Sequence, residues 1–233
     1  TELLTPDKTD TNSLFITARL NDIGIDVVSK AIVGDDPRDL EHAVAAALER
    51  ADVVITSGGL GPTADDLTRE AVAAVLGRAL HEDPVIVQQL VERFAARGVP
   101  MADINRRQAL VPEGATVLAN RRGSAPGLLL TRGDQVVVLV PGPPREMQPM
   151  FEDVCASTLA ARSGGRVLRR RVLKIAGQPE SQVDAVAAPV YSPLASADPA
   201  VVTTILAGPG QVELHLSARG TDAAQLDSAL DAA

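Results

Sequence analysis

Hydrophobic positions follow two alternating spacings over the first two thirds of the chain. Short runs of consecutive apolar, mostly β-branched residues predict buried strands, and apolar residues three or four positions apart predict helices that pack on them. Strands are expected over 25–33, 53–55, 116–118, 127–131 and 135–140, and helices over 11–23, 37–48, 65–76, 84–97, 104–110 and 145–161. This alternation is typical of a layered α/β domain.

The pattern changes after residues 162–165, where Arg-Ser-Gly-Gly interrupts it. A strand is expected over 167–175, a helix over 179–187, a proline-rich loop over 188–199, strands over 201–206 and 211–218, and a helix over 221–232. These elements predict a small α+β unit. The sequence therefore predicts two domains, at residues 1–161 and 166–233.

A glycine-rich turn follows the apolar run 53–55 and leads into a helix. Gly58, Gly59 and Gly61 permit backbone conformations and close approaches that a Cβ atom would hinder. This is the strand-end, helix-start arrangement at which α/β proteins bind anionic ligands. The turn therefore predicts a phosphate-bearing ligand.

Two adjacent carboxylates complicate that prediction. Asp65 and Asp66 would repel a phosphate unless a cation lay between them. One interpretation is a divalent metal, with Asp65 as its first ligand, and the hard oxygen donors suit Mg²⁺ or Mn²⁺, with Co²⁺ also compatible. The other interpretation is local, with Thr63 as the helix N-cap, Asp66 completing an acidic capping box and both aspartates favouring the helix dipole. Spacing alone supports the two interpretations equally.

Composition narrows the classes of protein that fit. Hydrophobic residues make up 45% of the chain and aromatics only 2%, so the core must consist of Val, Leu, Ile and Ala. A net charge of −8 argues against a general nucleic-acid-binding role. The single cysteine, Cys155, excludes an intrachain disulfide and is expected to be a buried structural thiol. No apolar run is long enough to span a membrane and no signal peptide is visible, so we expect no membrane partner and a cytoplasmic location.

Three further segments join the glycine-rich turn. They are Asn-Arg-Arg-Gln-Ala with Val-Pro-Glu-Gly-Ala within 105–115, Gly-Ser-Ala-Pro-Gly at 123–127, and Leu-Val-Pro-Gly-Pro-Pro-Arg-Glu-Met at 139–147. Taken singly, each is typical of an ordinary turn, with Arg106 and Arg107 as a solvated pair and Glu146 as a residue that favours a helix dipole. The last segment also follows an apolar run, so it supplies a second strand-end turn that could face the first.

The four segments together resemble the N-terminal part of the competence/damage-inducible (CinA) protein family, which belongs to the molybdopterin-binding-domain superfamily. The resemblance runs from residue 1 to about 151 and is carried by Gly-Gly-Leu-Gly-Pro-Thr-Ala-Asp-Asp-Leu-Thr and Pro-Gly-Pro-Pro-Arg-Glu-Met. It implies a three-layer α/β fold with a mostly parallel sheet, followed by a small KH-like domain. The family normally has a strand just before Thr-Glu-Leu-Leu and, in many members, a C-terminal nicotinamide-mononucleotide deamidase domain. Neither is present here, so a longer parent protein is expected and no deamidase activity is assigned.

The resemblance further implies a metal-dependent pyrophosphatase that hydrolyses ADP-ribose to AMP and ribose 5-phosphate, acting as a homodimer. Asp65 is the expected metal ligand, Asp66 a ligand or its neighbour, and Glu146 a residue that orients the metal or activates water. The expected substrate-binding residues are Gly58, Gly59, Gly61, Thr63, Asn105, Arg106, Arg107, Gly142 and Pro143, with Glu2 and Asn12 at the rim.

Two other classes of function remain open at this point. The fold could bind a pterin or nucleotide without turnover, or serve as a dimer scaffold for a missing enzyme domain. The small domain could bind RNA through Arg169, Arg170, Arg171 and Lys174, although the acidic chain and the lack of stacking aromatics argue against it. The simpler explanation of these four cations is a solvated strand face.

Overall fold

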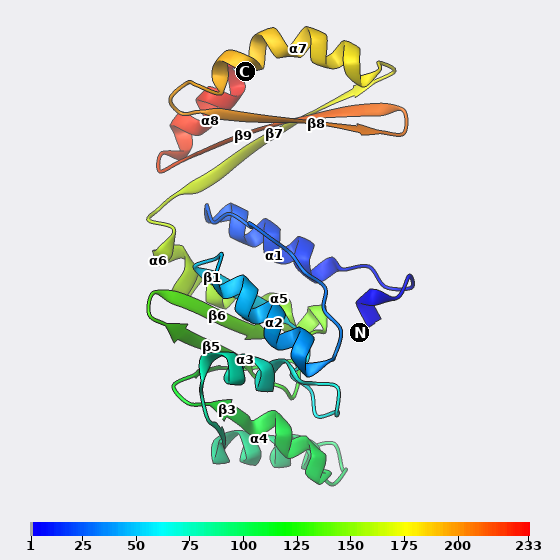
Figure 1. Cartoon of the computed structure of the whole chain (residues 1–233), viewed down its shortest axis with the longest axis vertical. Coiled ribbons are helices and arrows are strands. Elements are labelled where there is room, and N and C mark those ends of the chain that lie inside the picture. Colours follow the sequence, from blue (N-terminus) through cyan, green and yellow to red (C-terminus); the bar gives the residue numbers. More distant parts are fainter. Residues whose placement is uncertain (1) are drawn as a thin grey trace. The chain divides into compact units, whose positions relative to one another are not determined.

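The computed structural model describes residues 2–233, which form two compact units (Figure 1). The first unit contains the residues up to Ile16 together with Val28–Val154, and the second contains Thr17–Val27 together with Cys155–Ala233. The contacts thus divide the chain at Val154, before the interruption at 162–165. The two domains at 1–161 and 166–233 stay a prediction.

The elements follow one another in nearly the predicted order. The first unit contains η1 (Glu2–Leu4), the start of α1 (Thr11–Asp22), α2 (Pro37–Leu48), β1 (Val53–Ser57), α3 (Thr68–Leu76), β2 (Leu80–Glu82), α4 (Pro84–Ala95), η2 (Asp103–Ala109), β3 (Leu110–Pro112), β4 (Thr116–Leu118), β5 (Gly127–Arg132), β6 (Gln135–Val140) and α5 (Pro144–Val154). The second contains the end of α1, a π-helical segment η3 (Cys155–Leu159), α6 (Ala160–Arg162), β7 (Val167–Ala176), α7 (Glu180–Leu194), β8 (Val201–Gly208), β9 (Gln211–Gly220) and α8 (Ala223–Asp231).

The main sheet of the first unit has the strand order β1-β6-β5-β4. β1 pairs parallel with β6, whereas β6 with β5 and β5 with β4 are antiparallel. The α/β class is therefore confirmed, but the sheet is mixed where the sequence predicted mostly parallel pairing. The cause is the two-residue turn between Arg132 and Gln135, because such a short connection can join only antiparallel strands.

Strand β6 is buried on both of its faces, which makes the first unit three-layered. Val137 and Leu139 belong to a core cluster with Val72 of α3 and with residues of α2. The alternate side chains of β6 point the other way and are equally buried. The fully buried Phe151 belongs to α5, the helix that follows β6 and contacts it, and Figure 1 shows α2 and α5 on opposite sides of the sheet.

The strand predicted over 25–33 is absent. The segment runs without regular structure between α1 and α2, and its Val28 and Ile32 are exposed. An apolar run becomes a strand only when a neighbouring strand satisfies its backbone hydrogen bonds, and within the described residues none pairs with this segment. Segment 25–33 therefore has the apolar pattern of a strand but lacks a neighbouring strand to pair with.

The second unit packs two helices on a three-stranded antiparallel sheet of order β7-β9-β8. Its core contains Val201, Leu214 and Leu216 of the sheet with Leu226 and Leu230 of α8. The three strands and the last helix are confirmed close to their predicted ranges. Within residues 2–233, no helix has the length and apolar character needed to span a membrane.

Helix α7 corrects the predicted proline-rich loop over 188–199. The helix continues to Leu194 through Pro189 and Pro193. Prolines weaken a helix because they lack a donor and crowd the preceding turn. Here Ala187, Tyr191 and Leu194 repeat at helical spacing against the sheet, and this packing outweighs the local cost.

Candidate functional site

The two predicted strand-end turns lie against each other. Because β1 and β6 are parallel and pair Ser57 with Val140, the segments that follow the two strands leave the sheet at the same edge. The Gly58 amide donates to the Val140 carbonyl over 2.9 Å. A Cβ atom placed on Gly142 would lie 3.5 Å from the Gly58 Cα, so the two backbones pass in van der Waals contact. The expectation that the two turns face each other is confirmed.

Asn12, at the start of α1, joins both turns. Its Nδ2 donates to Ser57 Oγ over 2.8 Å and to the Gly142 carbonyl over 2.7 Å. Its Oδ1 is buried and has no hydrogen-bond partner within the described part of the chain. Asn12 was expected only at the rim, and Ser57 was missed because a serine ending a strand carries no distinctive signal.

The glycine-rich turn is longer than the capping interpretation required. Helix α3 begins at Thr68, and its N-cap, Leu67, makes no side-chain capping bond. Asp66 Oδ2 instead accepts from the amide of Thr63 over 2.9 Å and from its hydroxyl over 2.5 Å. The predictions of Thr63 as helix N-cap and Asp66 as its capping partner are therefore wrong, because the chain closes a separate turn before the helix starts.

Gly61 is required by the Asp66 side chain. A Cβ atom at Gly61 would lie 2.4 Å from Asp66 Oδ2, so the carboxylate would have to leave Thr63. We expect Gly61→Ala to lower the free energy of unfolding by about 1–2 kcal/mol, the usual cost of losing such hydrogen bonds. Urea unfolding measures the loss. The matched control is the same change in an Asp66→Ala background, where the clash is absent and the two effects should not add. Simple additivity would contradict this explanation of Gly61.

Asp65 is the exposed carboxylate of this turn. The pKa of Asp65 is lowered first by the nearby Thr63 side chain, whose hydroxyl has one proton to donate to either Asp65 or Asp66, and then by the backbone, whereas the charge of Asp35 raises it. Asp65 is therefore ionised at neutral pH. Asp35, whose charge influences Asp65, was not predicted.

The donor set for a metal is small. Within the part of the chain that the structure describes, no group of three or more His, Cys, Asp or Glu side chains is placed to hold a metal ion. The protein alone therefore supplies at most a pair of carboxylates at this turn. That number fits Mg²⁺, which protein carboxylates commonly hold by one or two ligands while substrate phosphates and water supply the others.

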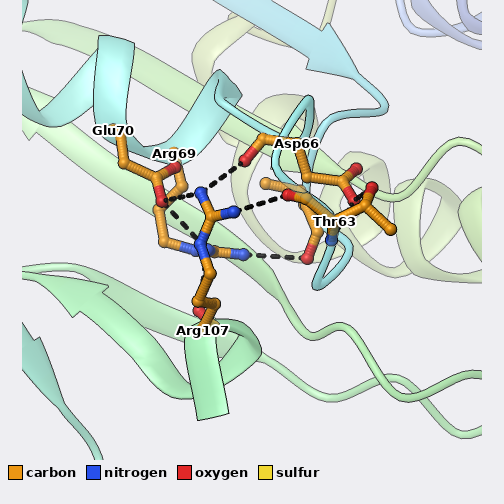
Figure 2. Close-up of polar contacts among 6 residues, drawn as sticks. Thr63, Asp66, Arg69, Glu70 and Arg107 are labelled. Carbon is orange, nitrogen blue, oxygen red and sulfur yellow. Dashed lines mark hydrogen bonds and ion pairs between the residues drawn. The ribbon is translucent and has the colours of Figure 1, made fainter. Parts of the chain in front are cut away.

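Arg107 supports the glycine-rich turn from behind (Figure 2). Its Nη1 donates to the Thr63 carbonyl over 2.5 Å, and its Nη2 lies 3.3 Å from the Asp66 carbonyl and 2.9 Å from Glu70 Oε1. Arg107 was predicted to bind phosphate or ribose. In the structure its guanidinium contacts the protein, and it fixes the loop that carries Asp65.

Arg69 completes this support, although no pattern in the sequence predicts it. It is 1% exposed, and it donates to the Leu60 carbonyl and to the Arg107 carbonyl, each over 2.8 Å. Burial lowers the pKa of Arg69, and the neighbouring Glu70 opposes that shift. We call Arg69 and Arg107 the arginine clamp, since together they bind the carbonyl oxygens of Leu60, Thr63 and Asp66 in the glycine-rich turn.

The remaining predicted residues lie apart from the clamp. Arg106 forms a two-pronged ion pair with Glu82 of β2, and Asn105 donates to the Ala102 carbonyl over 3.1 Å. Gly142 and Pro143 lie in the second strand-end turn, where Pro143 is exposed. Their predicted roles in substrate binding stay predictions.

Glu146 has a structural neighbourhood of its own. It is 9% exposed, and its Oε2 accepts from Asn120 Nδ2 over 2.9 Å. A Cβ atom at Gly123 would overlap this carboxylate, so the glycine of the Gly-Ser-Ala-Pro-Gly segment makes room for it. Asn120 also donates to the Ala125 carbonyl, so Glu146 helps to hold the loop before β5 against the start of α5. The predicted catalytic role of Glu146 stays a prediction.

Most of the basic residues of β7 are paired within the second unit. Arg169 lies 3.4 Å from Asp227, and Arg171 contacts both Asp227 and Asp231 of α8. Lys174 lies 3.0 Å from Glu213 of β9. These pairs account for three of the four cations that an RNA-binding surface would have used. That nucleic acid is not a partner stays a prediction.

Comparison with known proteins agrees with this architecture. A family profile described as a probable molybdopterin binding domain matches residues 1–161. The crystal structure of the protein CinA with unknown function from Thermoplasma acidophilum superposes with a TM-score of 0.62 at 31% identity, over 66% of this chain and 91% of that one.

Curated relatives match almost the whole chain. A CinA-like protein from Solibacter usitatus is 46% identical over 94% of this chain and 51% of its own length. A putative competence-damage inducible protein from Symbiobacterium thermophilum is 46% identical over 97% of this chain and 53% of its own length. The chain thus spans about half the length of these relatives. Its first 161 residues match the probable molybdopterin binding domain, and the chain belongs to the CinA-like (competence-damage inducible) protein family.

Proposed function

We propose that the first unit hydrolyses the diphosphate linkage of ADP-ribose, giving AMP and ribose 5-phosphate. The contact between the glycine-rich turn and the second strand-end turn carries this proposal, because it places two Cβ-free backbones at one sheet edge beside the ionised Asp65. In the reaction, one water adds across the linkage. The water oxygen forms a bond to one phosphorus, the bridging oxygen leaves with the other phosphate, and the water protons pass to the products and solvent.

The ligand would lie along the open side of the glycine-rich turn. The arginine clamp binds the carbonyls of Leu60, Thr63 and Asp66, so the clamp side of the turn is occupied by protein. The Gly58 amide is used by Val140, which leaves the amides at Gly59 and Gly61 as the candidate donors to phosphate oxygens. The buried, unpartnered Oδ1 of Asn12 offers an acceptor for a ribose hydroxyl at the same edge.

Asp65 would hold the divalent ion, with Asp66 contributing the carboxylate oxygen that does not bind Thr63. A bound Mg²⁺, Mn²⁺ or Co²⁺ would neutralise diphosphate charge and lower the pKa of a water molecule. The chain's own residues orient the two phosphates between the turns, and the clamp keeps Asp65 at a fixed place beside them. Mg²⁺ needs only one or two protein carboxylates, and this agrees with the small number of donors at the turn.

A binding module is the second candidate function. The free amides of the glycine-rich turn and the buried Asn12 Oδ1 favour it, because hydrogen bonds alone can retain a nucleotide or pterin without cleaving it. In that case the first unit would present a ligand, or simply a scaffold, to the remainder of a longer protein. We propose a cytoplasmic location for the protein with either function.

The deciding experiment measures AMP release from ADP-ribose with added Mg²⁺, Mn²⁺ or Co²⁺ and again with excess EDTA. The proposal expects release that depends on the metal. Titration calorimetry with ADP-ribose on the same sample provides the second readout. Binding without AMP would establish the binding module, and neither binding nor AMP would overturn both candidates for this ligand.

A further inference from the structure

The loop that leads into β5 brings a further cation to the edge of the sheet where the two turns meet. Arg122 lies on this loop, and its Nη1 donates to the Arg145 carbonyl, in the first turn of α5, over 3.3 Å. Since α5 begins directly after the second strand-end turn, Arg122 lies beside that turn. We propose that Arg122, Ser124 and the first turn of α5 form a separate phosphate subsite, which we call the Arg122 subsite.

Asn120 gives this loop a fixed shape. Its Oδ1 accepts from the amides of Arg122 and Gly123 over 3.0 and 2.6 Å, and its Nδ2 donates to Glu146 of α5. One side chain therefore closes the loop on itself and ties it to the helix. A loop that is already ordered lowers the entropic cost of binding a ligand. Arg122 is thus presented beside the second turn from a fixed backbone.

Most donors of the Arg122 guanidinium are unused. The side chain is exposed, and within residues 2–233 its guanidinium donates to the Arg145 carbonyl and pairs with no carboxylate. A planar guanidinium can bind two phosphate oxygens at once, which makes arginine well suited to recognise a phosphate. The remaining N–H groups of Arg122 are therefore available to such a ligand.

The charge around Arg122 is positive, although the chain as a whole carries −8. Arg121 is exposed on the same loop, and the Arg145 side chain is 76% exposed at the start of α5. The carboxylate among them is Glu146, which is buried, binds Asn120 and lies 3.8 Å from Arg145 Nε. The positive end of the α5 dipole adds to the three cations. The local field therefore favours an anion.

Ser124 adds an uncharged donor on the same loop. Its Oγ accepts from Gln108 Nε2 over 3.0 Å, and its own proton has no acceptor within the described residues. Gln108 is 2% exposed, and its Oε1 is buried without a hydrogen-bond partner in the same part of the chain. Buried polar groups are normally paired, so this oxygen indicates a polar group that the protein itself does not supply.

The Arg122 subsite assigns one phosphate of the diphosphate to each turn, and in this it rests on the proposed function. Water forms a bond to the phosphorus at the glycine-rich turn, the bond from that phosphorus to the bridging oxygen breaks, and the water protons pass to the products and solvent. The bridging oxygen leaves with the phosphate on Arg122, whose charge compensates the negative charge that this phosphate gains. Each product is then held by one turn.

Binding of the two products tests the subsite without turnover. The protein is titrated with AMP and, separately, with ribose 5-phosphate in excess EDTA, and phosphorus NMR follows each ligand. Arg122→Met should raise the dissociation constant of one product by about tenfold or more and leave the other unchanged, because a charge-assisted contact to one phosphate is lost. Arg122→Lys should recover part of the loss, since it keeps the charge without the planar fork.

Arg132→Met is the matched control. Arg132 is exposed and pairs with Gln135 at the start of β6, so it lies at the opposite end of that strand from the second turn. This variant should bind both products as the wild type does, and all three variants should keep the wild-type circular dichroism. Unchanged constants in Arg122→Met, equal losses for both products, or a wild type that binds neither product would overturn the proposal.

AMP release from ADP-ribose, measured with added metal, separates this proposal from the proposed function. Selective loss of product binding in a protein that releases no AMP would keep the Arg122 subsite and remove the hydrolase. AMP release that Arg122→Met leaves unchanged in rate and in substrate dependence would remove the subsite and keep the hydrolase.

Discussion

Asp65→Asn should reduce the rate of AMP release from ADP-ribose on the order of 100-fold, because the amide cannot replace a charged metal ligand. The change keeps the size and shape of the side chain. Asp65 is exposed and contributes little to packing, so the free energy of unfolding should stay nearly unchanged. The measurement is AMP release at saturating substrate over a Mg²⁺ or Mn²⁺ titration.

The matched control is Glu49→Gln, which removes the same charge. Glu49 follows α2 and precedes β1, so it lies at the opposite end of that strand from the glycine-rich turn. Its variant should keep wild-type activity. Asp65→Glu should recover part of the lost rate at higher metal concentration, since the carboxylate is retained at a longer reach. Full activity in Asp65→Asn would remove the metal-ligand assignment, whatever the fate of the proposed substrate.

The sequence predicted those features that depend on neighbouring residues alone. The run Val53–Ile55 became part of β1, and the two turns met because the strands that precede Gly58 and Gly142 pair in parallel. The segment 25–33 failed because a strand also needs a partner, which its own side chains do not specify. Likewise, α7 passes through Pro189 because its packing on the sheet outweighs a local preference.

The local chemistry of the turn was less predictable than its place. Thr63 and Asp66 have the spacing of a capping box, and they do bond to each other. The Thr68 amide, however, bonds back to the Gly59 carbonyl, so the residues between them form a loop before α3. Thr63 and Asp66 therefore close a turn within that loop and do not cap the helix. Glu146 and Arg107 were assigned to the ligand by type, and their nearest partners are protein atoms that only the fold brings to them.

The burial of Arg69 could not be predicted from the sequence either, because it depends on tertiary contacts. An arginine in the first turn of an amphipathic helix is usually solvated, and nothing in Thr-Arg-Glu-Ala marks this one as buried. Its burial depends on η2 lying next to α3, since Arg69 binds the carbonyl of Arg107, 38 residues away in the sequence. Stabilisation of a ligand loop by a buried cation is therefore a tertiary property, and it is testable apart from any activity.

Arg69→Met should lower the free energy of unfolding by about 3 kcal/mol, because it removes two charge-assisted hydrogen bonds, leaves the Leu60 carbonyl without its donor and leaves the Arg107 carbonyl with the Leu110 amide alone. Methionine keeps most of the apolar volume, so the loss reports on these bonds and less on a cavity. Urea unfolding followed by circular dichroism measures it.

Arg106→Met is the control, since it breaks an exposed ion pair with Glu82 at the same 3₁₀ segment and should cost at most about 1 kcal/mol. Equal losses in the two variants would show that burial of Arg69 adds nothing.

Arg69→Met should also raise the ADP-ribose concentration needed for half-maximal AMP release, because the clamp positions the turn that carries Asp65. Asp65→Asn should lower the rate and leave stability unchanged, whereas Arg69→Met should lower both stability and affinity. This difference separates the residue that contacts the ligand from the residues that hold it in place.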